Sequence, residues 1–376
     1  MRATVFLCLF TLFATLTGCD LVGSDDSVDT VNGKVVVANS GNFSAQDGSL
    51  TLYTPSTKNT ADADLDVAFI NSLTLHDGRL FVLDNTQSDN AGRITTFNAS
   101  RTLDFIALDP IDQTQNPRPP RFIAFPSDAK AYVTNLSRFD DNFNPKPSTV
   151  SVVDRADNTV EARVDVGRSP EDIAVTAGKA FVANSADGTL SVLNTDTDAV
   201  TSTVDLKCVK PKQVFVDGEN EVAVVCKGQV GTDAEVLFLD PSDNSIQTRV
   251  SLGAPVASAN ATQSAFFSAQ AEELYAVSGG AFGSGTGEIF RVNTDANALA
   301  TTLSVPDNDD LIGISAVGYD ATSQNLYVAR LPVNASGGPS YRANGTALVL
   351  NRKGTVTAQF ETGNAPGFIT FLTDAR

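Results

Sequence analysis

The chain has 376 residues, of which 42% are hydrophobic and 19% charged, and it contains 27 Gly and 16 Pro. This composition excludes a disordered chain and a coiled coil, and it favours a packed body rich in β-strands. The absence of Trp and the single His, His76, exclude Trp-based sugar platforms and zinc sites that need several His ligands. Acidic residues outnumber basic ones by 44 to 26, so the net charge of −18 disfavours nucleic acid as a partner unless basic residues gather in one place.

Residues 1–18 have the pattern of a secretory signal peptide. Arg2 precedes an apolar run from Val5 to Leu16, which at about a dozen residues is too short to span a bilayer. The run ends in Leu16-Thr17-Gly18-Cys19, which resembles the bacterial lipoprotein cleavage site, where the Cys becomes the lipidated N-terminus. We therefore expect an exported protein that is lipid-anchored through Cys19 in the cell envelope, in the outer membrane facing the periplasm or the cell surface. The alternative is an ordinary signal peptide that happens to end in Cys.

Residues 19–33 are small and acidic and show no apolar period, which predicts a flexible tether between Cys19 and the folded body. The Ser-Asp-Asp sequence that follows Cys19 resembles export signals of surface lipoproteins in Bacteroidota-type bacteria. Asp26-Ser27-Val28 and Asp29-Thr30-Val31 similarly resemble O-glycosylation sites of that group. The alternative for both is a plain acidic spacer.

Two cysteines remain beyond Cys19, namely Cys208 and Cys226. An even pair in an exported chain is a disulfide candidate, because the compartment is oxidising. The alternative is two buried free thiols.

A sevenfold internal repeat occupies residues 34–376. A triplet of the apolar-polar-apolar type recurs at a mean spacing of about 49 residues, the size of a β-propeller blade. The seven copies are Leu65-Asp66-Val67, Ile106-Ala107-Leu108, Val164-Asp165-Val166, Val204-Asp205-Leu206, Val250-Ser251-Leu252, Leu303-Ser304-Val305 and Phe360-Glu361-Thr362. Three further segments rich in β-branched residues precede each copy except the first, which has two, and this predicts four short antiparallel strands per unit. The predicted fold class is all-β, a seven-bladed β-propeller.

The first unit lacks an opening strand, because residues 20–33 contain no suitable apolar run. Pro366-Gly367-Phe368-Ile369-Thr370-Phe371-Leu372 follows the seventh unit and matches the opening strands of the other units. We expect this C-terminal strand to complete blade one and close the ring, which removes two exposed sheet edges.

The second predicted strand of each unit carries a motif shared with a known repeat family. Ala131-Tyr132-Val133-Thr134-Asn135 and Ala180-Phe181-Val182-Ala183-Asn184, each followed by a Val-x-Val or Leu-x-Val strand, resemble the repeats of YVTN-family β-propellers. That family is common among exported and cell-surface proteins of bacteria and archaea, so the resemblance implies a fold and a location. It supplies no catalytic motif. Unit five departs from the pattern with Val225 at the Asn position, and unit six departs with Ser278.

The longest insertions are expected on one face of the ring, which we call the long-loop face. It carries the loops between second and third strands, together with the connections from blade to blade. The insertions span Ser40–Gly48, Thr86–Gly92, Leu136–Ser148, Lys227–Ala234, Gly279–Gly287 and Leu331–Gly345. Insertions concentrated on one face are typical of a binding face. The alternative is neutral variation in loop length.

Basic residues gather in the connections that lead into blades three, four and five. They are Arg118, Arg121, Arg168, Lys207, Lys210 and Lys212, and Arg330 in blade seven joins them as a further ligand-binding candidate. Such a rim would suit an anionic ligand, because guanidinium groups bind carboxylate or phosphate through paired hydrogen bonds. The alternative is that these charges only offset nearby Asp residues.

Oxygen-rich stretches raise the question of a metal ion. Three acidic clusters would suit Ca²⁺, but none has the spacing of a complete calcium loop: Asp140-Asp141-Asn142 with Asn144, Asp307-Asn308-Asp309-Asp310, and Asp62, Asp64 and Asp66. Four residues at equivalent strand ends are weak metal candidates, although their repetition favours a structural cap: Asn39, Asp84, Asn135 and Asn184. His76 is expected to be an exposed turn residue. We expect no other cofactor.

These patterns favour a monomeric, non-enzymatic, lipid-anchored binding or scaffold module. Its long-loop face would bind a protein, a glycan or a small anionic ligand. The alternative is a metal-dependent hydrolase of the lactonase or phosphoesterase type, with its site at the central channel. A quinone cofactor is excluded, since such propellers normally carry Trp-containing repeats.

Overall fold

A computed structural model describes residues 33–372 of the protein, apart from 65–66, 86–91, 98–102, 108–118, 257–262 and 279–286. One compact unit spans Val31–Arg376. The expected signal peptide, Cys19 and nearly all of the acidic tether lie outside the described residues. Within the described part, no helix is long and apolar enough to cross a membrane.

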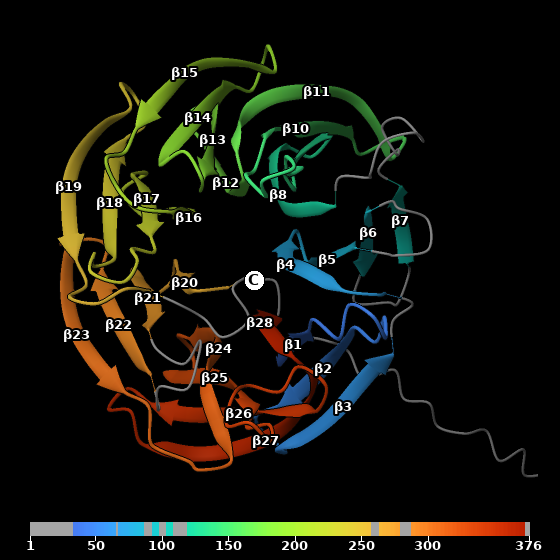
Figure 1. Ribbon diagram of the computed structural model, residues 1–376, viewed down its shortest axis with the longest axis vertical. Coiled ribbons are helices and arrows are strands. Elements are labelled where there is room, and N and C mark those ends of the chain that lie inside the picture. Colours follow the sequence, from blue (N-terminus) through green and yellow to red (C-terminus); the bar gives the residue numbers. More distant parts are fainter. Residues whose placement is uncertain are drawn as a thin grey trace, which may run out of the picture. The chain divides into compact units, whose positions relative to one another are not determined.

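Seven four-stranded antiparallel sheets form a ring, which confirms the predicted seven-bladed propeller (Figure 1). Blade one consists of β28 (Pro366–Leu372), β1 (Lys34–Asn39), β2 (Ser49–Thr54) and β3 (Asn59–Asp64), and blade two of β4 (Ile70–His76), β5 (Arg79–Asn85), β6 (Gly92–Phe97) and β7 (Leu103–Ala107). Blade three consists of β8 (Pro120–Ser127), β9 (Lys130–Asn135), β10 (Pro147–Asp154) and β11 (Thr159–Arg168). Blade four consists of β12 (Pro170–Thr176), β13 (Lys179–Asn184), β14 (Thr189–Asn194) and β15 (Ala199–Asp205). Blade five consists of β16 (Pro211–Val216), β17 (Val222–Cys226), β18 (Glu235–Asp240) and β19 (Ser245–Ser251). Blade six consists of β20 (Ala265–Ser268), β21 (Glu273–Ser278), β22 (Glu288–Asn293) and β23 (Ala298–Ser304). Blade seven consists of β24 (Leu311–Asp320), β25 (Asn325–Pro332), β26 (Asn344–Asn351) and β27 (Val356–Asn364).

Burial changes from the inner to the outer strands of each blade. Every residue of β1 and β21, both second strands, is buried, whereas β15 and β23, both fourth strands, contain no buried residue. A strand that is covered by neighbouring blades on both faces needs apolar side chains on both faces, which explains runs such as Val35-Val36-Val37. The core is therefore continuous across blade boundaries, and one cluster contains Val36, Val82, Tyr132 and Val182 from four successive blades.

The C-terminal strand closes the ring, as predicted. In the antiparallel register of β1 and β28, Val35 pairs with Phe371 and Val37 pairs with Ile369. Figure 1 shows β28, in red, beside the blue β1. Because β1 is bonded to β28 on one side and to β2 on the other, its edge is covered and blade one has the same four strands as the other blades.

In blades four to seven, the short turn between the third and fourth strands contacts the preceding blade. Their contacts are Lys130 with Asp198 (2.9 Å), Lys179 with Asn244 (3.1 Å), Glu221 with Asn297 (2.7 Å) and Glu273 with Arg352 (2.6 Å). At the boundary of blades two and three, a stack of rings takes this place. The guanidinium of Arg155 lies 4.8 Å from the ring centre of Phe125 and 5.7 Å from that of Phe81.

The strand register corrects the sequence alignment in blade five. Pro120 pairs with Asn135 and Pro170 pairs with Asn184, and in blade five Pro211 pairs with Cys226. Cys226, rather than Val225, therefore occupies the Asn position. The four consecutive residues Val222–Val225 gave the alignment no polar residue to fix its frame.

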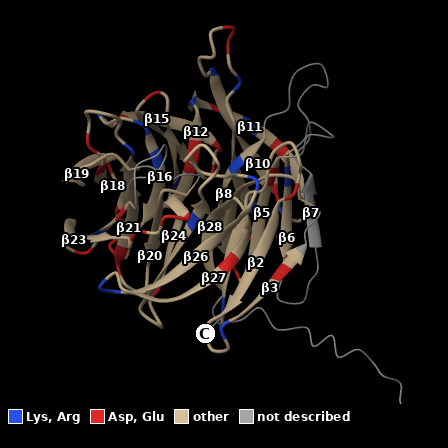
Figure 2. Ribbon diagram, turned by 60° about the horizontal axis from the view of Figure 1, so that its bottom comes forward, with Lys and Arg blue, Asp and Glu red and all other residues tan. Residues whose placement is uncertain are grey.

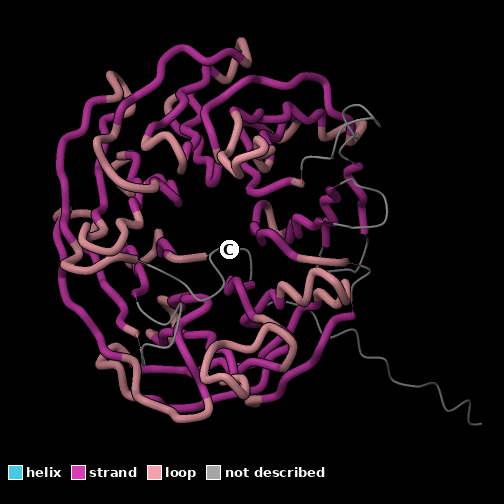
Figure 3. Tube along the Cα trace, in the orientation of Figure 1, coloured by secondary structure: helices cyan, strands magenta, loops and turns pink. Residues whose placement is uncertain are grey.

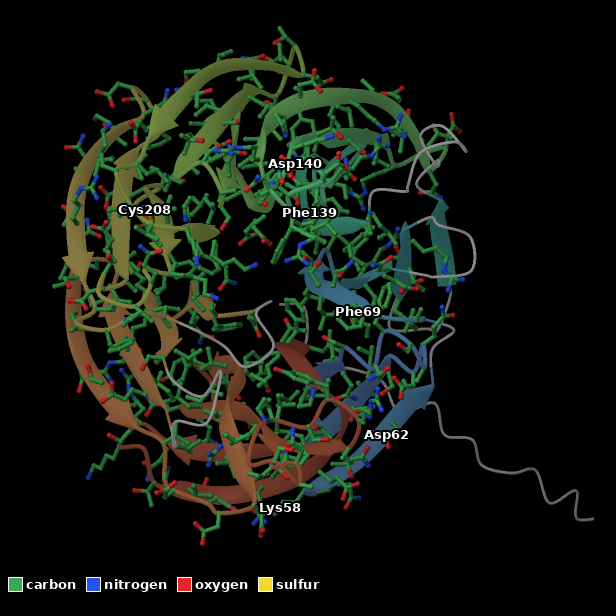
Figure 4. All side chains as sticks on the ribbon, in the orientation of Figure 1. Lys58, Asp62, Phe69, Phe139, Asp140 and Cys208 are labelled. Atoms are coloured by element: carbon green, nitrogen blue, oxygen red, sulfur yellow. A yellow bond between two sulfur atoms is a disulfide. The ribbon has the colours of Figure 1, made fainter. Side chains whose placement is uncertain are left out.

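The predicted disulfide between Cys208 and Cys226 is present. Cys208 belongs to the connection between blades four and five, and Cys226 ends the second strand of blade five. The bond therefore fastens the incoming connection to the blade that it enters (Figure 4 labels Cys208).

Deleting β28 should destroy the cooperative unfolding of the whole ring. A chain that ends at residue 364 leaves β1 with a bare edge and removes Phe368 and Ile369 from the core, which exposes the apolar side chains packed against them. We expect a broad thermal transition at lower temperature, or insoluble protein, in circular dichroism and calorimetry. The matched control ends at Leu372 and should unfold like the full chain. A cooperative and unshifted transition in the shorter chain would rule out ring closure as a source of stability.

Reduction of the disulfide should lower the free energy of unfolding by about 3 kcal/mol, because the bond closes a loop of about 18 residues in the unfolded chain. Urea unfolding with and without a thiol reductant measures this difference. The double variant Cys208→Ala/Cys226→Ala should unfold as the reduced protein does, and the reductant should not affect it. Equal midpoints for the oxidised and reduced wild type would contradict this expectation.

Candidate binding site at the centre of the long-loop face

The long loops form small ordered structures on the predicted face (Figure 3). Loops 136–148, 227–234 and 331–345 each contain an isolated antiparallel bridge, between Phe139 and Pro145, Gln229 and Thr232, and Val333 and Pro339. Loop 40–48 bonds back to the connection that enters its own blade, through Ser40 N and Ala365 O. Most of the insertions at 86–92 and 279–287 lie outside the described residues.

Exposed apolar side chains concentrate on these loops. Of the eight large apolar side chains exposed in the described part, five lie there: Phe43, Phe139, Phe143, Val230 and Tyr341. Phe143 is 85% exposed and Val230 is 99% exposed. In the view of Figure 4, Phe139 and Asp140 lie over the inner strands of blades three and four. The long loops thus carry most of the large exposed apolar side chains of the described part.

Three charged residues meet inside this rim, at equivalent positions of the inner strands of blades three, four and five. Arg121, Glu171 and Lys212 each follow the proline that begins their strand, in β8, β12 and β16. Glu171 Oε2 accepts hydrogen bonds from Arg121 Nη2 at 2.7 Å and Nε at 3.2 Å, and it lies 2.8 Å from Lys212 Nζ. One carboxylate therefore joins three blades. Figure 2 colours the basic positions of the ribbon blue and the acidic positions red.

Cations outnumber carboxylates in this cluster. Burial alone would raise the pKa of Glu171, but the charges of Arg121 and Lys212 outweigh it and lower that pKa to about 2. Burial lowers the pKa of Lys212 to about 8, although Glu171 opposes the shift. Lys227, which opens a long loop, is half-buried, and burial also lowers its pKa against the charge of Glu171. Within the described part, the side chain of Lys227 has neither an ion pair nor a hydrogen bond.

Polar side chains complete the bare inner edges of three strands. Asp172 Oδ2 accepts a hydrogen bond from Val214 N at 3.1 Å. Gln213 accepts from Ser264 N and donates to Ala265 O, and Gln263 in the same way bonds both N and O of Ile369 in β28. These side chains substitute for a fifth strand, so the centre of the ring is braced on blades five, six and one.

Asp172 is the most strongly perturbed carboxyl of this group. Burial raises its pKa to about 7, with a further contribution from the charge of Glu171. Hydrogen bonds from the backbone N–H groups of Val214 and Ile173 oppose the shift. Neither Glu171 nor Asp172 stood out in the sequence. The signal was present, since a charged Pro-Glu-Asp start is unusual for a buried inner strand.

The remaining predicted basic residues do not join this cluster in the same way. Arg168 pairs with Asp187 through Nε and Oδ1 at 2.5 Å, and Lys207 pairs with Asp205. Lys210 is exposed and has no ion pair among the described residues, while Arg118 lies outside them. Of the predicted rim, Arg121 and Lys212 are thus brought together, and the structure adds Lys227.

Arg330 is fully buried in blade seven. Its guanidinium donates to the carbonyl oxygens of Gly313 (3.0 Å), Pro306 (3.1 Å) and Leu311 (2.8 Å). Pro306 belongs to the connection from blade six, whereas Leu311 and Gly313 belong to β24, so the side chain supports the entry into blade seven. We therefore do not count Arg330 among the residues that would contact a ligand.

The four strand-end metal candidates lie in separate blades and contact their own surroundings. Asn39 Nδ2 donates to Ser49 Oγ and Thr51 Oγ1, both at 3.0 Å, and Asn184 Nδ2 donates to Thr189 and Ser191. Asn135 Nδ2 likewise donates to Thr149 and Ser151, and Asp84 Oδ1 accepts from the backbone N–H groups of Ala68 and Phe69. This pattern favours a structural cap over a shared metal site.

In the described part, two of the acidic clusters support local turns, and Asp62 of the third makes a cross-strand contact. Asp140 Oδ1 accepts from the backbone of Asn142 and Asn144, which lowers the pKa of Asp140. Asn308 Oδ1 accepts from Asp310 N, and Asp62 accepts from Thr51 Oγ1, whereas Asp66 lies outside the described residues. Calcium at these stretches remains a prediction.

His76 is less exposed than expected, at 28% of its side chain. Its ring stacks on Phe125 with centres 3.9 Å apart and planes 6° apart. Burial lowers the pKa of His76, and Asp77 and Asp128 oppose that shift. The ligand atoms of His76, Asp77 and Asp128 lie within 4.8 Å of one another, the one group of this kind found among the described residues.

No protein-family model matches the chain. No curated protein matches it either. Solved structures share its fold: a quinoprotein alcohol dehydrogenase-like protein from Bacteroides thetaiotaomicron is 12% identical with a TM-score of 0.62, covering 92% of this chain and 79% of that one. A functionally unknown protein from Desulfotomaculum acetoxidans is 12% identical with a TM-score of 0.61, covering 92% and 100%. A dihydro-heme d1 dehydrogenase is 11% identical with a TM-score of 0.56, covering 91% and 76%. These similarities establish a β-propeller fold that serves proteins of mixed function.

Asp172 should make the protein less stable as the pH rises from about 4 to about 7. The folded chain holds the Asp172 proton up to about pH 7, whereas the unfolded carboxyl releases it near 3.8, so the unfolding free energy falls by up to about 1.4 kcal/mol per pH unit in this window. Glu171 acts in the opposite direction only below about 4.5, where falling pH removes its stabilisation.

Urea unfolding across this pH range measures the slope. The variant Asp172→Asn should flatten it above pH 4.5, while Asp309→Asn, an exposed control, should leave it unchanged. A slope that persists in Asp172→Asn would show that other groups control it.

Proposed function

We propose that this protein is a binding module for a small anion that carries carboxylate or phosphate groups, held at the centre of the long-loop face. The observation that carries the proposal is the excess of cations around Glu171. Arg121, Lys212 and Lys227 interact electrostatically with this single carboxylate. Lys212 is buried and the other two are half-buried, which strengthens their attraction for an anion because less water screens the charges.

Lys227 is the residue best placed to meet such a ligand. Its ammonium has no partner in the described part of the chain, and bringing it out of water has a cost that a bound anion would offset. Arg121 and Lys212 already share Glu171 as an ion-pair partner. They would keep Glu171 in place and make the electrostatic potential around Lys227 more positive. The exposed apolar side chains of the surrounding loops, Phe139 and Phe143 among them, would cover the apolar part of an organic anion.

The cellular setting remains part of the proposal. The signal-like residues 1–18 and Cys19 support an exported, lipid-anchored monomer of the bacterial cell envelope, and the YVTN-like motifs support a surface or periplasmic role. The disulfide agrees with an oxidising compartment. The alternative hydrolase is not favoured, since Asn39, Asp84, Asn135 and Asn184 do not converge in the described structure.

Lys227→Gln tests the binding site without removing a member of the Arg121–Glu171–Lys212 group. Calorimetric titration at low ionic strength with inorganic phosphate, succinate and glucose 6-phosphate should detect binding to the wild type by at least one of them. The variant should bind that probe at least about tenfold more weakly, the equivalent of 1.4 kcal/mol for one lost charged contact. Added NaCl should weaken the wild type more than the variant.

The matched control is Lys207→Gln, which removes an exposed and already paired lysine from the same region. It should bind like the wild type. Absence of binding by all three probes, or equal affinities for Lys227→Gln and wild type, would overturn the proposal.

A further inference from the structure

A second polar cluster lies on the opposite face of the ring, where the turns between first and second strands are found. His76 is the last residue of β4 and Asp77 begins the turn that follows it, both in blade two. Asp128 occupies the corresponding turn of blade three, between β8 and β9. Three potential metal ligands from two blades therefore meet at one boundary, apart from the anion site proposed above.

The imidazole of His76 faces a carboxylate without a hydrogen bond between them. Nε2 lies 3.2 Å from Asp77 Oδ2, yet this buried nitrogen has no hydrogen-bond partner in the described part of the chain. A ring N–H aimed at the carboxylate would form a hydrogen bond at this distance. The two groups are thus close but not aligned with each other, and the nitrogen is left unsatisfied.

That spacing matches two ligands of one metal ion. Ligands held 2.0–2.1 Å from a tetrahedral ion lie about 3.3–3.4 Å from each other, and neither points directly at the other. Asp77 and Asp128 are exposed at the turns, so small rotations can bring their oxygens onto an ion beside Nε2. All ligand atoms already lie within 4.8 Å of one another.

The surroundings hold the imidazole in place. Its stack on Phe125, a residue of blade three, fixes the ring plane, and Arg155 covers Phe125 in turn. The guanidinium of Arg155 adds a positive charge nearby, and the two carboxylates supply negative charge that opposes this charge and that of a divalent ion. One imidazole and two carboxylates are ligands that Zn²⁺ accepts, with water in the fourth position.

We propose that His76, Asp77 and Asp128 bind one Zn²⁺ ion, which joins blade two to blade three. At the other described boundaries from blade three to blade seven, a direct polar contact through the turn after the third strand makes this connection. At the boundary of blades two and three, the turn of blade three instead places Arg155 on the stacked rings of Phe125 and Phe81. The metal ion would add the polar connection between these two blades.

The chain offers a clean spectroscopic test, because His76 is its only histidine. The protein from residue 20 onward retains all 28 strands, lacks Cys8 and Cys19, and has its two remaining cysteines in the disulfide. After treatment with a chelator, it should bind one ZnCl2 equivalent in calorimetry. Co²⁺ should give a visible absorption band, and Zn²⁺ should raise the unfolding temperature.

Two variants separate binding from folding. His76→Gln and Asp128→Asn should each lower Zn²⁺ affinity by at least about tenfold, since even outer-shell changes cost 10–100-fold. Asp128→Asn leaves the stack of His76 on Phe125 intact, so it remains informative if His76→Gln unfolds. Asp141→Asn, in an exposed acidic stretch on the other face, is the control and should bind like the wild type. Absence of stoichiometric Zn²⁺ binding, or binding that neither variant weakens, would overturn the proposal.

Discussion

Every blade must receive the chain from the outer edge of the preceding blade, and one side-chain position holds this crossing. The position lies at or within two residues of the end of the second strand. In blade two, Asp84 accepts hydrogen bonds from the backbone of the incoming connection at Ala68 and Phe69. In blade five, Cys226 forms a covalent bond to that connection, and in blade seven Arg330 donates to the carbonyl oxygen of Pro306 within it. A carboxylate, a thiol in a disulfide and a guanidinium thus each fix the incoming connection to its blade.

The asparagine blades use close packing at the same place. A Cβ on Gly167 would lie 2.5 Å from Asn184 Cγ, and one on Gly363 would lie 2.5 Å from Asn39 Nδ2. Only glycine lets the incoming backbone come this near to the amide. The Asn motif and the Gly that ends the preceding repeat are therefore two halves of one contact. This contact is a packing requirement in blades four and one, so it accounts for the recurring Asn and Gly there without any ligand.

The repeat made the fold predictable, and the departures from the repeat hid the candidate sites. The alternation of apolar residues predicted the seven blades, and the additional strand at the C-terminus predicted ring closure. Both predictions need only the local residue pattern and the number of repeats. The frame of blade five was wrong by one residue, since Val222–Val225 offers no polar landmark. Arg121 and Lys212 were found as basic residues, but Glu171 and Lys227 were not, because their meeting depends on how three blades converge. In the sequence Arg330 looked like the other basic candidates for ligand binding. Only its burial against backbone carbonyl groups distinguishes it from them.

The closure of the ring also determines how the protein can carry a load. Gly33 N donates to Leu372 O, so the start of β1 lies directly against the end of β28. A pulling force that arrives through the segment before residue 33 enters β1, which is bonded along both edges. Its hydrogen bonds lie perpendicular to the strand, so tension along β1 loads two ladders in shear at the same time and does not peel them apart one bond at a time. The strand that closes the circle therefore acts as a clamp on the end of the chain where an anchor would pull.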